Sequence, residues 1–403
     1  MSSLGRPPSG LSREGCVATI AGPGSPPLAQ DRGTRGTRRR ATVQRGRASG
    51  EGAAVQYADW GVRSPRWVGI GSESIEIRGT RVRLLRADAA PGAPPGAPTQ
   101  LLLHGLAAGG VFVLDLIRPL TAFGPVVAPD LPGSIFGHTG TPHPRAPRVE
   151  SNARFVRALT CRLSMRCACV HGWSMGAAVA IRFAADCPDR VSGVVLANPP
   201  LPVPLRPAER VAAQTLGRLA VAVGPTLLRV LIRRWGRRMI DTKLAYLQGG
   251  TVPEWFAGLG GNLAQIPSDT MAVWTEELAG LRSHPETLGY AATAFASVMS
   301  GIVVDQRPVW DAIDRLAAPV LLLWGEEDPL LARPVIDAVL ARRPDWDLHV
   351  FAGAGHAAPV ERPDEYAAAV HRWLTDSSSS APGDGRAGTA EGRRGPAPRG
   401  PVG

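Results

Sequence analysis

Residues 170–177 contain the pattern Gly-x-Ser-x-Gly and read Val170-His171-Gly172-Trp173-Ser174-Met175-Gly176-Ala177. An apolar stretch at 166–171 precedes the pattern and a helical pattern at 175–187 follows it, which predicts a strand, a sharp turn and a helix. A serine on such a turn has a strained backbone, and the flanking glycines leave room for the neighbouring chain. The turn would hold the Ser174 hydroxyl at the end of the strand, beside the positive end of the helix.

Apolar runs alternate with helical patterns on both sides of this turn. Strands are expected at 101–103, 126–128, 166–171, 191–197, 320–323 and 348–351, and helices at 111–123, 151–163, 175–187, 333–342 and 363–374. Residues 74–88 alternate polar and apolar side chains around Arg78-Gly79-Thr80, which predicts a β-hairpin. The alternation predicts an α/β fold, a mainly parallel sheet flanked by helices whose strands end at one common edge.

Composition divides the chain into five segments. Residues 1–66 are rich in Gly, Pro, Ser and Arg without periodicity, and we expect a disordered basic arm there. Residues 376–403 have the same character and are expected to form a disordered tail. Residues 67–200 and 306–375 carry the two parts of the α/β core. Between them, residues 201–305 are mostly helical in pattern, and we expect an inserted helical cap over the sheet edge.

The net charge of +11 could indicate a nucleic-acid partner, but eleven arginines lie in residues 1–66. The chain has one lysine, so we attribute the arginine excess to codon usage and predict no specific nucleic-acid partner. Arg229, Arg233 and Arg237 form a stripe at i, i+4 spacing in the cap segment. A solvated face is the favoured interpretation, with an interfacial or anionic-substrate surface as the alternative. No run of 18 apolar residues is present, so no transmembrane segment is expected.

Five cysteines are too few and too unevenly spaced for a disulfide framework, which favours a reducing compartment. The N-terminus lacks an apolar export signal, so we expect a cytoplasmic protein. Cys167, Cys169 and His171 would share one face of a strand, but no further ligand group lies nearby. No metal site is therefore predicted.

A serine hydroxyl becomes a nucleophile when a base removes its proton, and that base needs an acid to orient it. Asp328 follows the apolar run at 320–323, and His356 lies in a glycine-flanked loop after 348–351. Both should reach the edge that carries Ser174. The alternative site for the acid, after the strand at 191–197, holds the neutral residue Asn198.

Other interpretations of these residues remain open. Ser174 could be a plain helix cap, and Glu326 or Glu327 could replace Asp328 as the acid. Four other histidines compete with His356, although none lies in a glycine-flanked loop after a strand: His138, His143, His349 and His371.

Two backbone N–H groups are expected to bind the oxyanion that forms during acyl transfer. Met175 supplies one, because it follows the nucleophile at the start of the helix. We assign the other to Leu106, in the loop after the strand at 101–103. His104 is interpreted as a hydrogen-bonded anchor of that loop, and Trp173 is expected to face the substrate pocket.

Five motifs stand in the order typical of the α/β-hydrolase superfamily, and residues 70–375 resemble it. They are Leu103-His104-Gly105, Ala128-Pro129-Asp130-Leu131-Pro132-Gly133, Gly172-Trp173-Ser174-Met175-Gly176, Gly325-Glu326-Glu327-Asp328 and Gly355-His356. The motifs look most like those of small carboxylesterases and cofactor-free haloperoxidases with a helical cap. The loop after Gly133 is longer than usual, and the extra glycines of one lipase branch are missing after Gly105.

The resemblance implies a serine hydrolase with a Ser174–His356–Asp328 triad, acting on an ester or similar acyl bond of a small molecule without a cofactor. C–C bond hydrolase, thioesterase or perhydrolase activity on the same triad is the first alternative. A non-catalytic ligand receptor on the same fold is the second. Epoxide hydrolases and haloalkane dehalogenases are disfavoured, since they carry Asp at the position of Ser174.

Overall fold

The structure is a computed structural model that describes residues 56–136, 143, 145–249 and 265–379. An eight-stranded sheet forms its centre, in the order β1-β2-β4-β3-β5-β6-β7-β8. β1 pairs antiparallel with β2 and β2 with β4, while the remaining pairs are parallel. The strands are β1 (Gly71–Ile77), β2 (Thr80–Ala87), β3 (Thr99–Leu103), β4 (Val126–Pro129), β5 (Ala168–Trp173), β6 (Val191–Ala197), β7 (Val320–Gly325) and β8 (Asp347–Phe351).

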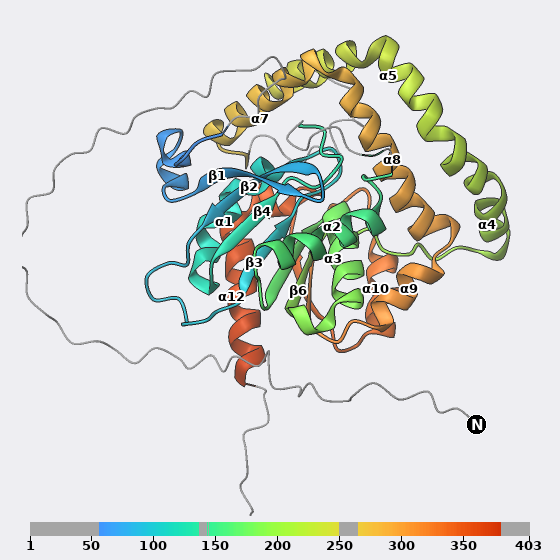
Figure 1. The fold of residues 1–403 in the computed structure, drawn as a ribbon. Helices are drawn as coiled ribbons and strands as arrows, with labels where there is room; N and C mark the ends of the chain where they lie inside the picture. Colours follow the sequence, from blue (N-terminus) through green and yellow to red (C-terminus); the bar gives the residue numbers. More distant parts are fainter. Residues whose placement is uncertain (1–55, 137–142, 144, 250–264, 380–403) are drawn as a thin grey trace, which may run out of the picture.

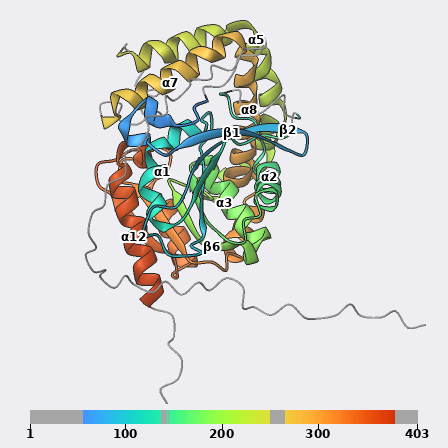
Figure 2. The same cartoon turned by 60° about the vertical axis from the view of Figure 1, so that its left-hand side comes forward.

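Helices cover both faces of this sheet. Figure 2 shows α1 and α12 on one face and α2 and α3 on the other. The helices outside the cap segment are α1 (Leu114–Leu120), α2 (Val149–Arg162), α3 (Met175–Asp186), α9 (Arg307–Asp314), α10 (Arg333–Arg342), α11 (Ala358–Glu361) and α12 (Pro363–Ser379). Single 3-10 turns are η1 (Trp60–Val62), η2 (Pro65–Trp67), η3 (Gly110–Val113), η4 (Thr121–Phe123) and η5 (Pro188–Arg190). The α/β fold and its mainly parallel sheet are thus confirmed, and the helix expected at 111–123 is divided into η3, α1 and η4.

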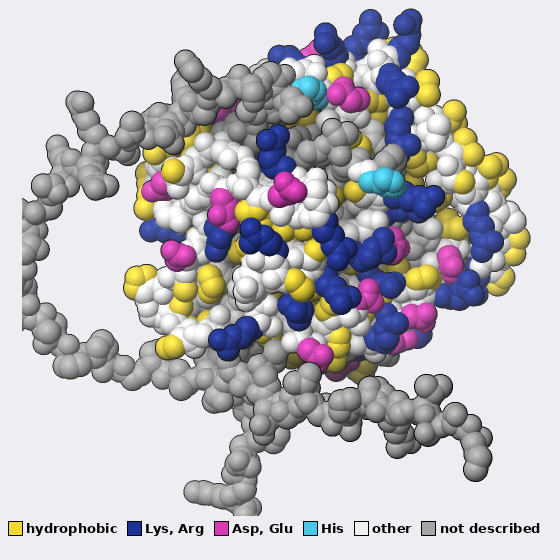
Figure 3. Space-filling model, in the orientation of Figure 1, with side chains coloured by type: hydrophobic (Ala, Val, Ile, Leu, Met, Phe, Trp, Pro, Cys, Tyr) yellow, Lys and Arg dark blue, Asp and Glu magenta, His cyan; other side chains and the backbone are white. Residues whose placement is uncertain are grey.

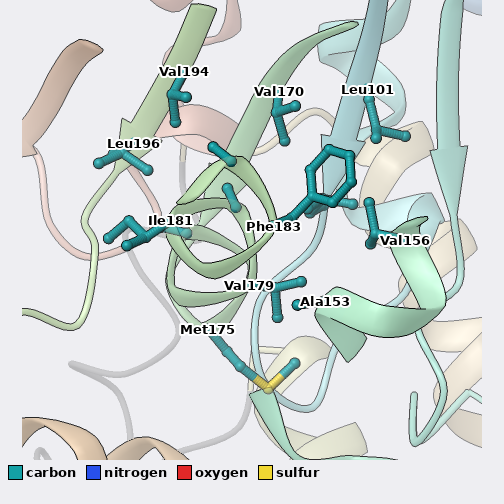
Figure 4. Packing of buried hydrophobic residues seen from close by; sticks show 14 of the residues in the cluster. Leu101, Ala153, Val156, Val170, Met175, Val179, Ile181, Phe183, Val194 and Leu196 are labelled. Carbon is teal, nitrogen blue, oxygen red and sulfur yellow. The ribbon is translucent and has the colours of Figure 1, made fainter. Parts of the chain in front are cut away.

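Two hydrophobic cores lie on the two faces of the sheet because side chains alternate along each strand. Leu101 and Leu103 of β3 belong to one core, whereas Leu102 between them belongs to the other. Figure 4 shows the first core, where Val170 of β5 and Phe183 of α3 pack together. Strands buried on both faces read as continuous apolar runs, which is why the sequence pattern located them well.

The folded part begins earlier than residue 67, the boundary expected from composition. Trp60 and Trp67 are fully buried against the sheet. The Trp60 indole donates to Ser72 Oγ at 2.6 Å, and the Trp67 indole donates to Asp115 Oδ1 at 2.8 Å. Aromatic side chains bury a large area, and two of them anchor this otherwise polar stretch. At the other end α12 extends through Ser379, past the expected boundary at 375. The rest of the expected arm and tail, 1–55 and 380–403, lies outside the described residues.

The described part of the cap segment, residues 201–305, is mostly helical. Its elements are α4 (Pro207–Ala212), the π-helical turn η6 (Ala213–Gly217), α5 (Arg218–Leu247), α7 (Ser268–Gly280), η9 (Leu281–Ser283), η10 (Pro285–Thr287), α8 (Leu288–Met299) and η11 (Ser300–Val304). Ile240 and Leu278 of the cap pack with Ile135 and Phe136, which follow the carboxyl end of β4. The cap segment therefore packs on loops at the carboxyl edge of the sheet, above it in Figures 1 and 2.

Two helical stretches of the cap segment are long and apolar enough to cross a membrane, by length and composition alone. They are Pro207–Leu247 and Pro285–Val304. The expectation that the chain has no transmembrane segment is not tested by this criterion and stays a prediction. Isolated arginines and glycines break up a continuous apolar run, but they do not make a long helix polar on average.

A buried ionic cluster fastens the cap segment to the sheet. Arg83 of β2 donates from Nε to Asp130 at 2.9 Å and from one terminal nitrogen to Glu277 of α7 at 2.6 Å. Arg83 and Asp130 have no exposed side-chain surface, and Glu277 has 2%. Burial disfavours the guanidinium charge, but the two carboxylates outweigh burial and raise the pKa of Arg83. Asp130 also accepts the Gly110 N–H at 2.6 Å, which ties the loop after β3 to the same cluster.

The adjacent residue Glu276 provides a matched control for Glu277. Glu276 pairs with Arg63 at the surface, where 43% of its side chain is exposed. We expect Glu277→Gln to lower the free energy of unfolding by about 3 kcal/mol, because it leaves a buried charge under-compensated. Glu276→Gln should cost less than about 1 kcal/mol, as is usual for exposed pairs. Urea unfolding of both variants measures the difference, and equal losses would contradict a special role for the buried cluster.

A buried chain of hydrogen bonds links Gln100 of β3, His171 of β5 and Tyr366 of α12. Gln100 donates its amide N–H groups to the carbonyls of Pro98 and Phe123, so its oxygen accepts from His171 Nε2 at 2.9 Å. His171 Nδ1 therefore accepts the Tyr366 hydroxyl proton at 2.9 Å. This arrangement holds the imidazole neutral, and burial lowers the pKa of His171 to about 3.

The low pKa of His171 makes the free energy of unfolding depend on pH. Below pH 6.5 an unfolded chain gains a proton at this histidine while the folded chain does not, so stability falls as the pH drops from 6.5 toward 3. His171 should contribute a slope of about 1.4 kcal/mol per pH unit across this window. Denaturant titrations at several pH values should show a shallower slope in His171→Asn than in the wild type. Equal slopes in the two proteins would contradict the inference that the buried His171 imidazole is neutral.

Candidate active site

Ser174 lies on the turn between β5 and α3, where the sequence predicted it. Its backbone has φ of 52° and ψ of −122°, a strained conformation for a residue with a side chain. A Cβ on Gly172 would lie 2.4 Å from Ala177 Cα, and one on Gly176 would lie 2.1 Å from the Leu103 carbonyl oxygen. Glycine at both positions is therefore a steric requirement of the turn, and the turn holds the Ser174 hydroxyl at the carboxyl edge of the sheet.

The structure brings Asp328 and His356 to the same edge. Asp328 lies three residues after β7, and His356 lies in the loop after β8. His356 Nε2 is 2.9 Å from Ser174 Oγ, and His356 Nδ1 is 2.8 Å from Asp328 Oδ2. Asp328 and His356 are 7% and 8% exposed, which removes most competing water from the chain of hydrogen bonds.

The direction of each proton follows from the partners. Asp328 Oδ1 accepts the Leu330 backbone N–H at 2.8 Å, so both carboxylate oxygens act as acceptors. The Nδ1 atom of His356 must then carry the proton in that bond, which leaves Nε2 as an acceptor for the Ser174 hydroxyl. The arrangement has the geometry of a nucleophile, a general base and an orienting acid.

Asn198 is a residue that sequence reasoning passed over as merely neutral. Its side-chain N–H groups donate to the carbonyls of Gly355 at 3.0 Å and His356 at 2.7 Å, and its oxygen accepts the Gly325 N–H at 2.8 Å. Asn198 thus joins the ends of β6 and β7 to the loop that carries His356. Its φ of 44° lies in the left-handed region, which asparagine tolerates better than most residues. The sequence did contain a signal for Asn198, because a polar residue directly after a buried strand lies at the edge where the site forms.

Trp173 has a structural contact in addition to its expected place in the pocket. Its indole N–H donates to the His356 carbonyl oxygen at 2.9 Å, and the two rings lie 6.4 Å apart. Two side chains, those of Trp173 and Asn198, therefore hold the backbone of His356. A contact between Trp173 and substrate remains a prediction.

The loop after β3 carries Leu106 and lies against the nucleophile. A Cβ on Gly105 would lie 3.3 Å from Ser174 Cβ. His104 Nδ1 donates to the Gly105 carbonyl at 2.8 Å, and Nε2 accepts the Leu131 N–H at 2.9 Å, so His104 is the loop anchor expected from the sequence. Burial lowers the pKa of His104 and keeps the ring neutral. Because N–H and C=O point in opposite directions across a trans peptide, holding the Gly105 carbonyl also orients the Leu106 N–H.

The competing residues lie elsewhere. Glu326 and Glu327 are exposed, whereas Asp328 is buried. His349 contacts Glu365, His371 lies beside Phe123, and His143 bonds to the Arg145 backbone. His138 falls outside the described residues.

Cys167, Cys169 and His171 have the spacing of metal ligands in the sequence, but the structure does not bring them together as a group that could hold a metal ion. In the described parts of the chain no group of three or more His, Cys, Asp or Glu side chains could hold a metal ion. Burial raises the pKa of Cys169 to about 12, so its thiol packs as a neutral apolar group.

Several known proteins with similar sequences are hydrolases. The chain is 36% identical over 78 residues to the esterase YbfF of Escherichia coli, covering 19% of this chain and 31% of that esterase. It is 26% identical over 290 residues to a 2-hydroxy-6-oxononadienedioate/2-hydroxy-6-oxononatrienedioate hydrolase of Burkholderia vietnamiensis, covering 69% of this chain and 88% of the relative. Among solved structures, Cfl2 of Burkholderia cenocepacia has a similar fold, with a TM-score of 0.56 and 21% identity over 77% of this chain and 97% of that one.

The family model described as "Alpha/beta hydrolase family" matches residues 100–369. This range includes the Ser174 turn, Asp328 and His356 as well as the cap segment. The protein is therefore a member of the alpha/beta hydrolase family.

Proposed function

We propose that this hydrolase cleaves a carboxylic ester, or a similar acyl bond, of a small molecule through an acyl-enzyme. The hydrogen-bonded chain from Ser174 through His356 to Asp328 carries the proposal, with heavy-atom distances of 2.9 and 2.8 Å. Such spacing lets a neutral imidazole accept the serine proton without rearrangement.

The reaction has two halves. Ser174 Oγ attacks the acyl carbon while its proton moves to His356 Nε2, and Asp328 stabilises the imidazolium that results. The N–H groups of Leu106 and Met175 bind the negatively charged oxygen of the tetrahedral intermediate. His356 then returns the proton to the leaving alcohol, and the acyl group stays on Ser174. Water, deprotonated by His356, attacks the acyl carbon. His356 then returns this proton to Ser174 Oγ as the acid leaves, which restores the starting state with the chain's own groups and water.

The residue at position 174 separates this proposal from two related chemistries. Epoxide hydrolases and haloalkane dehalogenases need a carboxylate nucleophile, and serine occupies the position here. A C–C bond hydrolase on the same triad is the second candidate, and the relative from Burkholderia vietnamiensis favours it. We also propose that Trp173 borders the substrate pocket, since it directly precedes Ser174 and its indole contacts the His356 loop.

The nucleophile can be tested with a fluorophosphonate probe and with short p-nitrophenyl esters. The wild type should be labelled and should hydrolyse the esters. Ser174→Ala should lose labelling and at least about 10³-fold in kcat, since no other group can form the acyl-enzyme. Labelling of Ser174→Ala at another residue would contradict the assignment. Labelling of the wild type without turnover of any ester would point instead to a C–C bond hydrolase or a ligand receptor.

The role of His104 in orienting the Leu106 N–H gives a separate expectation. His104→Ala frees the Gly105–Leu106 peptide and leaves the buried Leu131 N–H unpaired. We expect kcat for ester hydrolysis to fall by about 10²-fold with little change in KM, as for the loss of one oxyanion donor.

His104→Gln serves as the matched control because a glutamine amide can both donate to the Gly105 carbonyl and accept from Leu131. This variant should recover much of the lost kcat. Equal kcat values for the alanine variant and the wild type would refute the positioning role.

A further inference from the structure

The outer face of the longest cap helix is apolar. α4, η6 and α5 form one continuous helical stretch, Pro207–Leu247. Fourteen large hydrophobic side chains are exposed among the described residues, and ten of them lie on this stretch. The ten are Val211, Leu216, Leu219, Val223, Leu227, Leu228, Val230, Leu231, Trp235 and Met239. Single exposed leucines are ordinary, but a continuous apolar surface of this length is typical of an interaction site.

The opposite side of the same helix is already occupied. Ile232, Gly236 and Ile240 are buried, and Ile240 packs with Leu278 of the cap segment and with the loop after β4. A Cβ on Gly236 would lie 3.1 Å from Pro285 Cβ, and one on Gly217 would lie 3.2 Å from Val304 Cγ2. Close packing at both ends fixes which side of the helix faces outward. The helix therefore lies along the surface of the protein, with its apolar side free for a partner.

Basic residues adjoin the apolar face. Arg233, Arg234, Arg237 and Arg238 are exposed, and none of them forms an ion pair with any residue that the structure describes. The one acidic residue of α5, Asp241, accepts from Arg282 at 2.7 Å. Figure 3 shows hydrophobic side chains along the outer rim where Figure 1 draws α4 and α5, with Lys and Arg side chains gathered next to them.

We propose that this face docks on the surface of a lipid bilayer that contains anionic lipids. The exposed leucines and valines would enter the boundary between headgroups and acyl chains, and the four arginines would pair with lipid phosphates. Because its inner side packs on the protein, the helix lies in the plane of the interface and does not span the bilayer. This inference goes beyond the proposed hydrolase activity, since it concerns where the protein resides.

Charge distinguishes a bilayer from other occupants of the face. A second copy that packed through the same face would place the four arginines against an apolar or an equally basic surface, and neither neutralises them. The chain's own residues 1–55 hold nine arginines against three acidic residues, so they would also be repelled. A nucleic acid would neutralise the arginines but would leave the apolar side chains in water. An anionic bilayer satisfies both kinds of side chain.

Co-sedimentation of the full chain with vesicles tests the proposal. The wild type should bind vesicles of phosphatidylcholine mixed with phosphatidylglycerol, bind far less to phosphatidylcholine alone, and lose binding as salt is added. Arg233→Gln/Arg234→Gln/Arg237→Gln/Arg238→Gln should lower the partition coefficient at least about tenfold. Leu219→Gln/Leu227→Gln/Val230→Gln should lower it by a similar factor, because these three side chains are 62%, 59% and 58% exposed.

A variant with the same change in net charge elsewhere is the matched control. Arg154→Gln/Arg157→Gln/Arg162→Gln/Arg166→Gln alters four exposed arginines on or beside α2 and should bind as the wild type does. All three variants should keep the circular dichroism spectrum and the melting temperature of the wild type, which report that the fold is intact. Co-sedimentation measures vesicle binding and does not require enzymatic activity. The test therefore remains valid if the proposed hydrolase function proves wrong.

Three outcomes would overturn the proposal. The first is wild-type binding by the Arg233–Arg238 variant, which would assign binding to another basic segment such as residues 1–55. The second is equal binding to neutral and anionic vesicles, or to neither. The third is a concentration-dependent dimer in analytical ultracentrifugation that the Leu219 variant abolishes, with no vesicle binding, which would make the face a self-association surface.

Discussion

The turn at Ser174 depends on two places where backbone meets backbone with no room for a side chain. Gly172 faces Ala177 at the start of α3, and Gly176 faces the Leu103 carbonyl at the end of β3. These contacts hold the start of α3 close against β5 and β3, and they force Ser174 into its strained conformation. Packing of α3 in the hydrophobic core offsets the free energy of this strain, since α3 is buried along most of its length. The position of the hydroxyl is therefore set by packing.

The rest of the site is assembled by hydrogen bonds from neighbouring strand ends. Asp328 lies in the loop after β7 and His356 in the loop after β8. Asn198, at the end of β6, forms hydrogen bonds with the end of β7 and with the His356 loop. On the other side of Ser174, His104 fixes the peptide before Leu106. Each of these side chains is held at both of its polar ends, so little reorganisation is needed when charge develops in the reaction.

The sequence predicted the sheet well, and it predicted that Ser174, Asp328 and His356 lie close together at one edge, because both expectations depend on local patterns. A buried parallel strand is a continuous apolar run, and the residues of a site at the strand ends lie in the loops that follow such runs, as Asp328 and His356 do. The cap segment and the ends of the chain were harder to predict. Whether an apolar helix faces the core or the solvent depends on which stripe meets a neighbour, and Leu219 and Ile240 look alike in sequence although one is exposed and the other buried. Trp60 and Trp67 likewise fold a stretch whose average composition is that of a linker.

Asn198 also limits how this site can change over evolutionary time. Its amide nitrogen faces the carbonyl oxygens of Gly355 and His356. An aspartate there differs from asparagine by a single atom, yet it would set a bare carboxylate against two carbonyl dipoles and lose the loop they anchor. Under the proposed mechanism, one mutation therefore cannot move the orienting acid from the end of β7 to the end of β6. The new acid at position 198 would displace the loop that carries His356, the histidine that it has to orient.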